Sequence, residues 1–106
     1  MLIGPDSFWS GEAIALAVQA RANTRTFGEP TSGSTALWNN FKLSDGALLW
    51  LKIATMVDPN PNAPAPNGKP ITPDQVVQIN PTLYDNPEDP VLKAALEWLK
   101  SQPVCK

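Results

Sequence analysis

The first third of the chain alternates short apolar runs with turn residues, and this pattern predicts a strand, a helix and a second strand. Residues 1–4 (MLIG) are apolar and precede a Pro-Asp-Ser turn. Residues 10–22 are rich in helix formers, and within them 13–18 carry no polar side chain, so this helix is apolar nearly all round. Residues 24–29 (TRTFGE) follow as a strand. This order fits a right-handed βαβ unit with parallel strands.

The middle of the chain predicts a β-hairpin. Residues 35–43 alternate between two faces, residues 44–46 (SDG) form a tight turn, and residues 47–57 (ALLWLKIATMV) return. The returning run is apolar on both faces apart from one lysine, which predicts a central strand buried on both sides. Trp38 and Trp50 lie on facing strands, and we expect them to pack in the core or against each other.

The last part of the chain predicts a loop, a short strand and a helix. Residues 57–73 hold six prolines and should form an exposed, extended loop. Residues 76–79 predict a short strand. Residues 89–101 predict the best-defined helix, with Asp89 as N-cap, a proline at the first helical position and Trp98 on the core face. We therefore expect an α/β fold made of a βαβ unit, a hairpin and a C-terminal helix.

Composition and charge exclude several classes of partner. Eight basic and ten acidic residues give a formal charge of −2, so the sequence predicts neither nucleic acid nor an anionic membrane as a partner. No apolar run approaches the ~20 residues that span a bilayer, and residues 1–20 lack the pattern of a signal peptide. These features predict a soluble protein.

The chain offers little for metal or cofactor chemistry. It has no histidine, which excludes a Ser-His-Asp triad and an HExxH zinc site within this chain. Cys105 is the single cysteine, so no internal disulfide can form. The acidic residues Asp85, Glu88 and Asp89 are too dispersed among prolines to predict a calcium site. We expect no metal and no cofactor.

The amount of apolar surface predicts self-association. A chain of 106 residues buries only roughly 60–65% of its unfolded surface when it folds alone. Here a nearly all-apolar helix and a doubly apolar strand both need covering. A homo-oligomer would supply the cover, and a symmetric dimer, with or without exchanged elements, is the form we expect first.

Several motifs occur in an order that resembles a known family. The sequence is similar to the C-terminal part of the catalytic domain of the tail-specific (C-terminal processing) serine peptidases. The similarity covers nearly the whole chain, 1–106, as a single partial domain. It is carried by residues 9–12 (WSGE), the basic residues Arg21 and Arg25, 28–33 (GEPTSG), 43–46 (LSDG), 68–74 (GKPITPD) and 89–96 (DPVLKAAL). The resemblance implies a crotonase/ClpP-like core, hydrolysis of peptide bonds, and a periplasmic or extracellular location.

The resemblance also identifies the positions of the catalytic residues, and both are substituted. In the family the nucleophile stands three residues before the helix glutamate; counting back from Glu12 leads to Trp9. Of a Ser-Ser-Gly-Glu elbow only Ser10 remains. The lysine of a Ser-Lys dyad follows the second glycine of the Gly-Glu-x-Thr-x-Gly motif, and that position is Ser34. The resemblance thus implies hydrolase ancestry with peptidase activity lost.

Two interpretations of the elbow stay open. Ser10 is either an ordinary N-cap or a nucleophile shifted by one residue, which would need Lys42, Lys52 or Lys69 as base and would favour an ester over a peptide. Trp9 is a buried anchor in the vacated pocket, an interface contact, or a substitution selected for its own sake. The alternative to a weak hydrolase is a non-catalytic α/β module that self-associates.

Three further polar residues have structural and functional interpretations. Glu29 and Thr31 either shape the loop by hydrogen bonds or act beside a catalytic serine. Asp74 is predicted to be a turn or cap residue.

Overall fold

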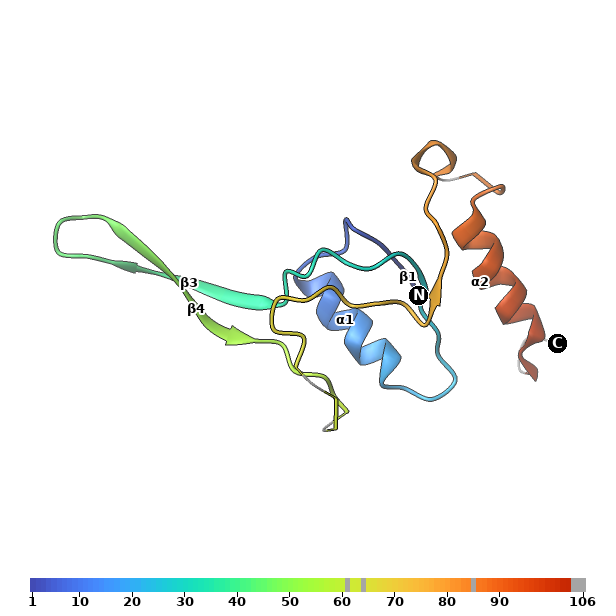
Figure 1. Ribbon diagram of the computed structural model, residues 1–106, viewed down its shortest axis with the longest axis horizontal. Helices are drawn as coiled ribbons and strands as arrows, with labels where there is room; N and C mark the ends of the chain where they lie inside the picture. The colour runs from blue at the N-terminus through green and yellow to red at the C-terminus, as the bar shows by residue number, and fades with distance from the viewer. Residues whose placement is uncertain (61, 64, 85, 104–106) are drawn as a thin grey trace.

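The computed structural model describes residues 1–60, 62–63, 65–84 and 86–103. Its first unit contains strand β1 (Leu2–Ile3), helix α1 (Ser10–Gln19) and strand β2 (Phe27–Gly28). β2 pairs in parallel with β1 on one side and with β5 (Gln75–Val76) on the other, giving the order β1-β2-β5 (Figure 1). The predicted βαβ unit is confirmed. Cys105 and Asp85 lie outside the described residues.

Both predicted partner strands are shorter than the sequence pattern suggested, because side chains take over the pairing at their ends. Thr26 N–H and Oγ1–H both donate to Asp74 Oδ2 at 2.7 Å, and Asp74 N–H donates back to Thr26 Oγ1 at 2.9 Å. Thr26 is fully buried. Asp74 is therefore a tie between the ends of β2 and β5, rather than the turn or cap residue that the sequence predicted.

The core is small and covers one face of α1. It consists of Ile3, Ala15, Leu16 and Ile71, with Met56 packed against it. On the opposite side of the helix Ile14 is exposed. A helix that is apolar nearly all round was expected to be covered on several sides, and the described residues cover only one.

The C-terminal helix forms as predicted. α2 (Pro90–Ser101) is capped by Asp89, which accepts hydrogen bonds from the N–H groups of Val91 and Leu92, and Pro90 occupies the first position. A 3-10 turn, η1 (Pro81–Leu83), precedes it.

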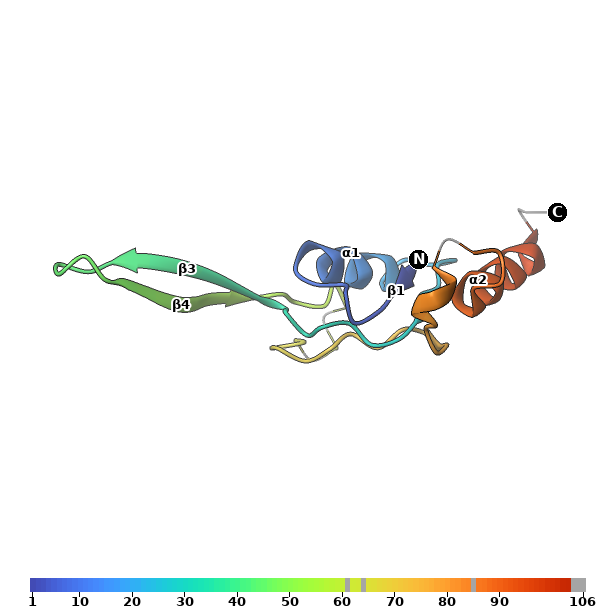
Figure 2. The same ribbon diagram turned by 90° about the horizontal axis from the view of Figure 1, so that it is seen from above.

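The same helix packs against the three-stranded sheet. Trp98 lies against Phe27 of β2 with ring centroids 6.0 Å apart, which confirms its predicted packing role. Figure 2 shows α2 at the opposite end of the molecule from the hairpin. No helix in the described part of the chain is long and apolar enough to cross a membrane.

The hairpin forms within one or two residues of the predicted boundaries but not with the predicted burial. β3 (Ala36–Lys42) pairs antiparallel with β4 (Leu48–Thr55), with one irregularity in register between Leu37 and Trp38. The two strands form a sheet of their own and project from the body (Figures 1 and 2). Within the described residues no third strand pairs with them, so the prediction of a strand buried on both sides is wrong.

The tryptophans of the hairpin are exposed rather than in a core. Trp38 is 54% exposed and Trp50 is 59% exposed. Trp38 is opposite Lys52, and Trp50 is opposite Asn40, so the two indoles are diagonal neighbours on one face. The chain as a whole is elongated, with extents of 62 × 36 × 18 Å. The α/β class with a hairpin and a C-terminal helix is confirmed.

Candidate functional site

The elbow between β1 and α1 is a tight, strained turn. Ser7 N–H donates to Gly4 O at 2.8 Å, and Gly4 N–H donates to Ser7 Oγ at 3.2 Å, which closes residues 4–7 into a turn. Trp9 then adopts φ 47° and ψ −112°, outside the regions that a residue with a Cβ favours. Such a conformation costs about 1–3 kcal/mol and is found where a fold displays a side chain at a functional turn.

The strain is held in place by the first turn of the helix. Trp9 O accepts hydrogen bonds from Glu12 N–H at 3.0 Å and from Ala13 N–H at 3.1 Å. Phe8 O accepts from Gly11 N–H at 3.0 Å. The elbow therefore presents whatever side chain stands at position 9 at the start of a helix, where backbone N–H groups favour negative charge.

Ser10 is not the N-cap that one interpretation of the sequence suggested. Trp9 occupies the capping position and makes no side-chain capping bond, while Ser10 is the first helical residue. The reason is the sharp turn at Trp9, which brings Ser10 into helical conformation one residue earlier. Both side chains are exposed, and Trp9 is 62% exposed to solvent. The expectation that Trp9 fills a closed pocket as a buried anchor is therefore wrong.

A cavity of about 480 Å³ lies between the elbow and the base of the hairpin. Its walls are mainly aromatic and aliphatic: Trp9, Ser10, Ala36, Leu37, Trp38, Trp50, Ala54, Thr55 and Met56. The polar side-chain groups among these lining residues are the hydroxyls of Ser10 and Thr55 and the indole N–H groups of the three tryptophans. The cavity suits an apolar group placed beside Ser10, and the described residues around it supply neither a carboxylate nor an amine.

None of the three lysines proposed as a base lines this cavity. Lys52 Nζ donates to Asn67 Oδ1 at 2.6 Å, which directs it to the proline-rich loop. Lys42 ends β3 at the turn, away from the elbow, and Lys69 lies within the loop. Because the chain has no histidine either, the described residues leave Ser10 without a partner to accept its proton.

The most buried polar group of the site is Glu12, in the first turn of α1. It is 0% exposed. Its Oε1 accepts from Thr31 Oγ1–H at 2.6 Å and from Gly33 N–H at 2.8 Å. Within the described part of the chain Oε2 has no hydrogen-bond partner. Sequence reasoning uses Glu12 only to locate the nucleophile position and misses this role; a carboxylate next to an apolar helical run is the signal that could have found it.

Glu12 fixes the loop that carries the family's lysine position. Thr31 Oγ1 also accepts from Ile71 N–H at 2.8 Å, which ties the loop to the end of the proline-rich segment. Gly33 has φ 80°, and a Cβ there would meet Gly68 O at 3.0 Å, so this position requires glycine. Ser34, next in the chain, pairs with Ser32: Ser32 Oγ–H donates to Ser34 Oγ at 3.1 Å.

The same loop is bonded directly to the elbow. Ser32 N–H donates to Ser7 O at 3.0 Å. Glu29, which follows β2, accepts a hydrogen bond at Oε1 from the N–H of Ile79, in the segment after β5, at 2.9 Å. The loop-shaping interpretation of Glu29 and Thr31 is thus confirmed. The segments that carry Trp9 and Ser34 are thus held together by the Ser32–Ser7 backbone bond and by Glu12. The side chains of Trp9 and Ser34 are not hydrogen-bonded to each other.

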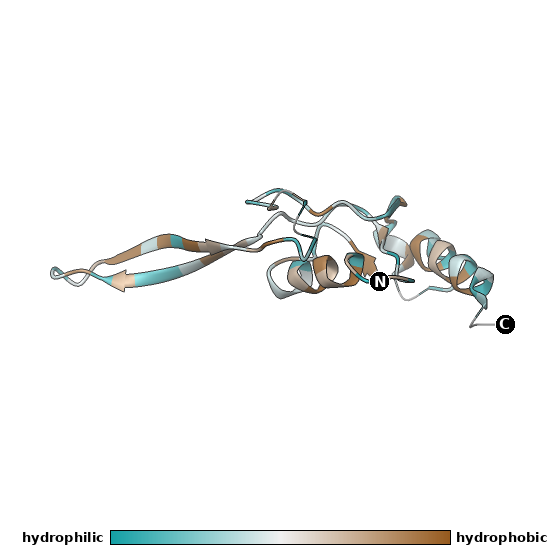
Figure 3. Cartoon of the chain, turned by 90° about the horizontal axis from the view of Figure 1, so that it is seen from below, coloured by the Kyte–Doolittle hydropathy of each residue, from teal (hydrophilic) through white to brown (hydrophobic). Residues whose placement is uncertain are grey.

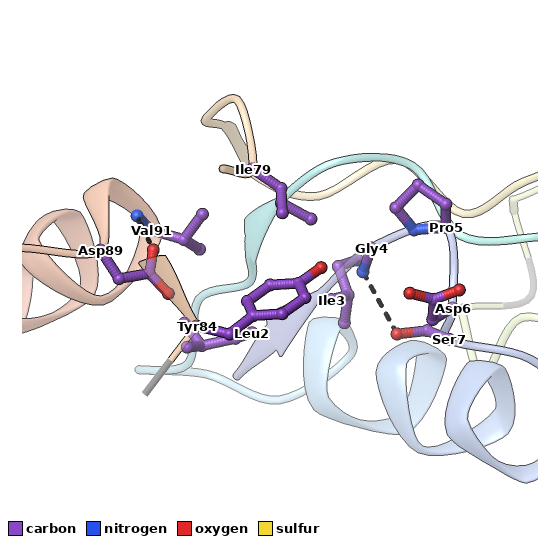
Figure 4. A pocket seen from close by; sticks show the side chains of 10 residues that line it. All are labelled: Leu2, Ile3, Gly4, Pro5, Asp6, Ser7, Ile79, Tyr84, Asp89 and Val91. Atoms are coloured by element: carbon purple, nitrogen blue, oxygen red, sulfur yellow. Dashed lines mark hydrogen bonds between the residues drawn. The ribbon is translucent and has the colours of Figure 1, made fainter. Parts of the chain in front are cut away.

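A second cavity, of about 500 Å³, lies between β1 and the start of α2 (Figure 4). Leu2, Ile79, Tyr84 and Val91 contribute to its walls. Its polar side chains are partly committed elsewhere. Ser7 Oγ holds Gly4 N–H, and Asp89 caps α2.

In the described ranges there is no group of three or more His, Cys, Asp or Glu side chains that could hold a metal ion.

Comparisons with known proteins found similarity to a solved structure and to a family of proteins. The structure of a lipoprotein from Streptococcus agalactiae is similar to this chain, with 29% sequence identity and a TM-score of 0.65. The similarity covers 94% of this chain and 30% of the lipoprotein, so the chain spans about a third of that protein's length. No curated protein matches the sequence significantly. The model of peptidase family S41 matches residues 1–77, which include the elbow, Glu12 and the loop at 28–34. The chain therefore belongs to peptidase family S41.

Proposed function

We propose that this chain is part of an S41 catalytic domain that no longer cleaves peptide bonds, and that it hydrolyses activated esters slowly through Ser10. The observation that carries the proposal is Trp9: its backbone has the strained φ of 47° suited to displaying a nucleophile, yet its side chain is an indole. An indole cannot form an acyl-enzyme. The elbow has kept its shape while its reactive group has been replaced.

Cleavage of a peptide needs more than the elbow supplies. The departing amine must receive a proton. The family resemblance places the lysine that would donate it at position 34, where this chain has a serine. The chain also has no histidine. Because this chain lacks both the nucleophile and the acid–base group of the family's peptidases, we do not expect it to hydrolyse peptides.

An activated ester makes smaller demands. Ser10 Oγ attacks the carbonyl carbon, its proton passes to water, and a phenolate leaves without protonation; water then hydrolyses the acyl-serine to the free acid. The helix dipole at the N-terminus of α1 favours the developing oxyanion, although the N–H groups of residues 11–13 already donate to carbonyl groups of the elbow. The apolar cavity beside Ser10 accommodates a short acyl chain. Without a base the rate stays low.

The proposal is tested by incubating the protein with a p-nitrophenyl ester of a short acid and with an unstructured peptide. We expect slow ester hydrolysis and intact peptide, and Ser10→Ala should remove the ester activity. Ser32→Ala, which changes a serine exposed in the neighbouring loop, is the matched control and should retain it. Peptide cleavage by the parent protein would reject the lost-peptidase assignment. Unchanged ester turnover in Ser10→Ala would reject Ser10 as the nucleophile.

A further inference from the structure

One face of the β3–β4 hairpin is apolar and carries no charge. Cross-strand partners share a face and alternate along each strand, so Asn39 and Leu51 lie on the same face as Phe41 and Leu49. Leu43 continues this face, because its N–H donates to Ala47 O at 2.8 Å and prolongs the pairing. We name these five residues the uncharged face. Its four hydrophobic side chains are each 42–45% exposed.

The opposite face of the hairpin is different in character. It carries Trp38, Asn40, Lys42, Leu48, Trp50 and Lys52. Lys52 reaches Asn67 of the proline-rich loop, and both tryptophans line the cavity beside the elbow. This face therefore adjoins the body of the molecule at Lys52 and at the tryptophans, which stay more than half exposed, whereas no residue of the uncharged face lines that cavity.

The hairpin extends as an arm with no other described element beside it. Figure 3 shows hydrophobic segments along both of its strands, well outside the body. A two-stranded hairpin is marginally stable in water unless its apolar face is covered. Its two outer edges are also unpaired within the described part of the chain.

The chain exposes more surface than a compact monomer of its mass, by more than a dimer interface requires. A compact monomer of 11.4 kDa is expected to expose about 5,800 Å², whereas this chain exposes 7350 Å². Its radius of gyration is 17.3 Å, against about 13 Å expected for a compact chain of this length. A stable interface buries about 800 Å² on each partner. The surplus, about 1,500 Å², is enough for such an interface on each copy.

We infer that the uncharged face is covered by the same face of a second copy of this chain. A twofold axis places identical surfaces together, so a charge on this face would be buried on both copies at once; this face carries none. The contact therefore needs no charge to be desolvated, and it buries apolar side chains on both copies at once. Two hairpins stacked in this way form a small sandwich with sheets about 10 Å apart. The inference is independent of the chemistry proposed for Ser10.

Adjacent asparagines on β3 give a matched test. Asn39 lies on the uncharged face and Asn40 on the opposite one, and both are exposed. Asn39→Lys places a charge inside the proposed interface, whereas Asn40→Lys adds the same charge outside it. Light scattering after size exclusion should give twice the 11.4 kDa chain mass for the parent and for Asn40→Lys. For Asn39→Lys it should give the monomer mass, with a dissociation constant raised at least about tenfold, because a buried unpaired charge is costly.

Two controls keep the result decisive. Neither asparagine lies in the core, so far-UV circular dichroism of both variants should match the parent. Ile14→Lys, on the exposed side of α1, should remain dimeric. A parent protein that is monomeric at high micromolar concentration would overturn the inference and leave another occupant, such as a different segment of an S41 domain. Dissociation by Ile14→Lys but not by Asn39→Lys would overturn it by placing the interface on the helix.

Discussion

Thr31 Oγ1 donates a hydrogen bond of 2.6 Å to Glu12 Oε1 and at the same time accepts one from the N–H of Ile71. One hydroxyl thus joins the helix of the elbow, the loop at the family's lysine position and the end of the proline-rich segment. Both side chains are buried, so water cannot replace either bond. The pair fixes the relative position of the three segments that make the candidate site.

Replacing Glu12 by alanine should therefore destabilise the fold strongly. The change leaves Thr31 O–H and Gly33 N–H buried without an acceptor, and we expect a loss of about 3 kcal/mol in the free energy of unfolding. Urea denaturation followed by circular dichroism measures it. Glu97→Ala, which removes an exposed carboxylate from α2, serves as control and should change stability by less than about 0.5 kcal/mol. A loss of similar size in both variants would mean that Glu12 has no special role.

The pairing of Glu12 with Thr31 can be measured directly by a double-mutant cycle. Thr31→Val keeps the side-chain volume and removes the hydroxyl. Because the two residues share a hydrogen bond, the loss in the double variant Glu12→Ala/Thr31→Val should be smaller than the sum of the single losses by about 1–2 kcal/mol. Thr31→Ser, which keeps a hydroxyl, should retain most of the parent stability. Additive losses would show that the two side chains stabilise the fold separately.

Sequence reasoning predicted the elements well because their signals are local. The order of the βαβ unit, the positions of the hairpin strands and the Asp89 cap of α2 depend on patterns within a few residues. The environment of Glu12 could not be read in the same way, since its partners are 19 and 21 residues away along the chain.

The error about the hairpin has a different physical cause. Hydrophobic alternation reports which faces avoid water, but it does not report what covers them. The run at residues 47–57 is apolar on both faces, a pattern typical of a central strand, yet among the described residues β4 has one strand beside it. Ser10 was assigned as a possible cap because serine favours that position; the backbone turn at Trp9 takes it instead.

The strained turn at Trp9 gives a prediction about glycine. At φ 47° and ψ −112° a residue with a Cβ is unfavourable, whereas glycine adopts the mirror-image regions freely. Trp9→Gly should therefore be more stable than Trp9→Ala by about 1 kcal/mol, although glycine is ordinarily the poorer residue near a helix. Comparing these two variants removes the effect of losing the indole, which is common to both. Urea denaturation decides the order, and a more stable alanine variant would show that position 9 is not strained in solution.

Restoring both family positions tests whether the elbow has kept its catalytic geometry. Trp9→Ser returns a hydroxyl to the displayed position, and Ser34→Lys returns an amine to the loop that Glu12 and Gly33 hold against α1. Because a serine nucleophile needs a base, each single variant should hydrolyse a p-nitrophenyl ester at about the parent rate. The double variant should exceed both by at least about tenfold, since a paired base contributes typically 10²–10⁴-fold. Ser32→Lys combined with Trp9→Ser moves the amine by two residues and should give no gain. A double variant that is no faster than its single parents would mean that the two positions do not come together in this chain.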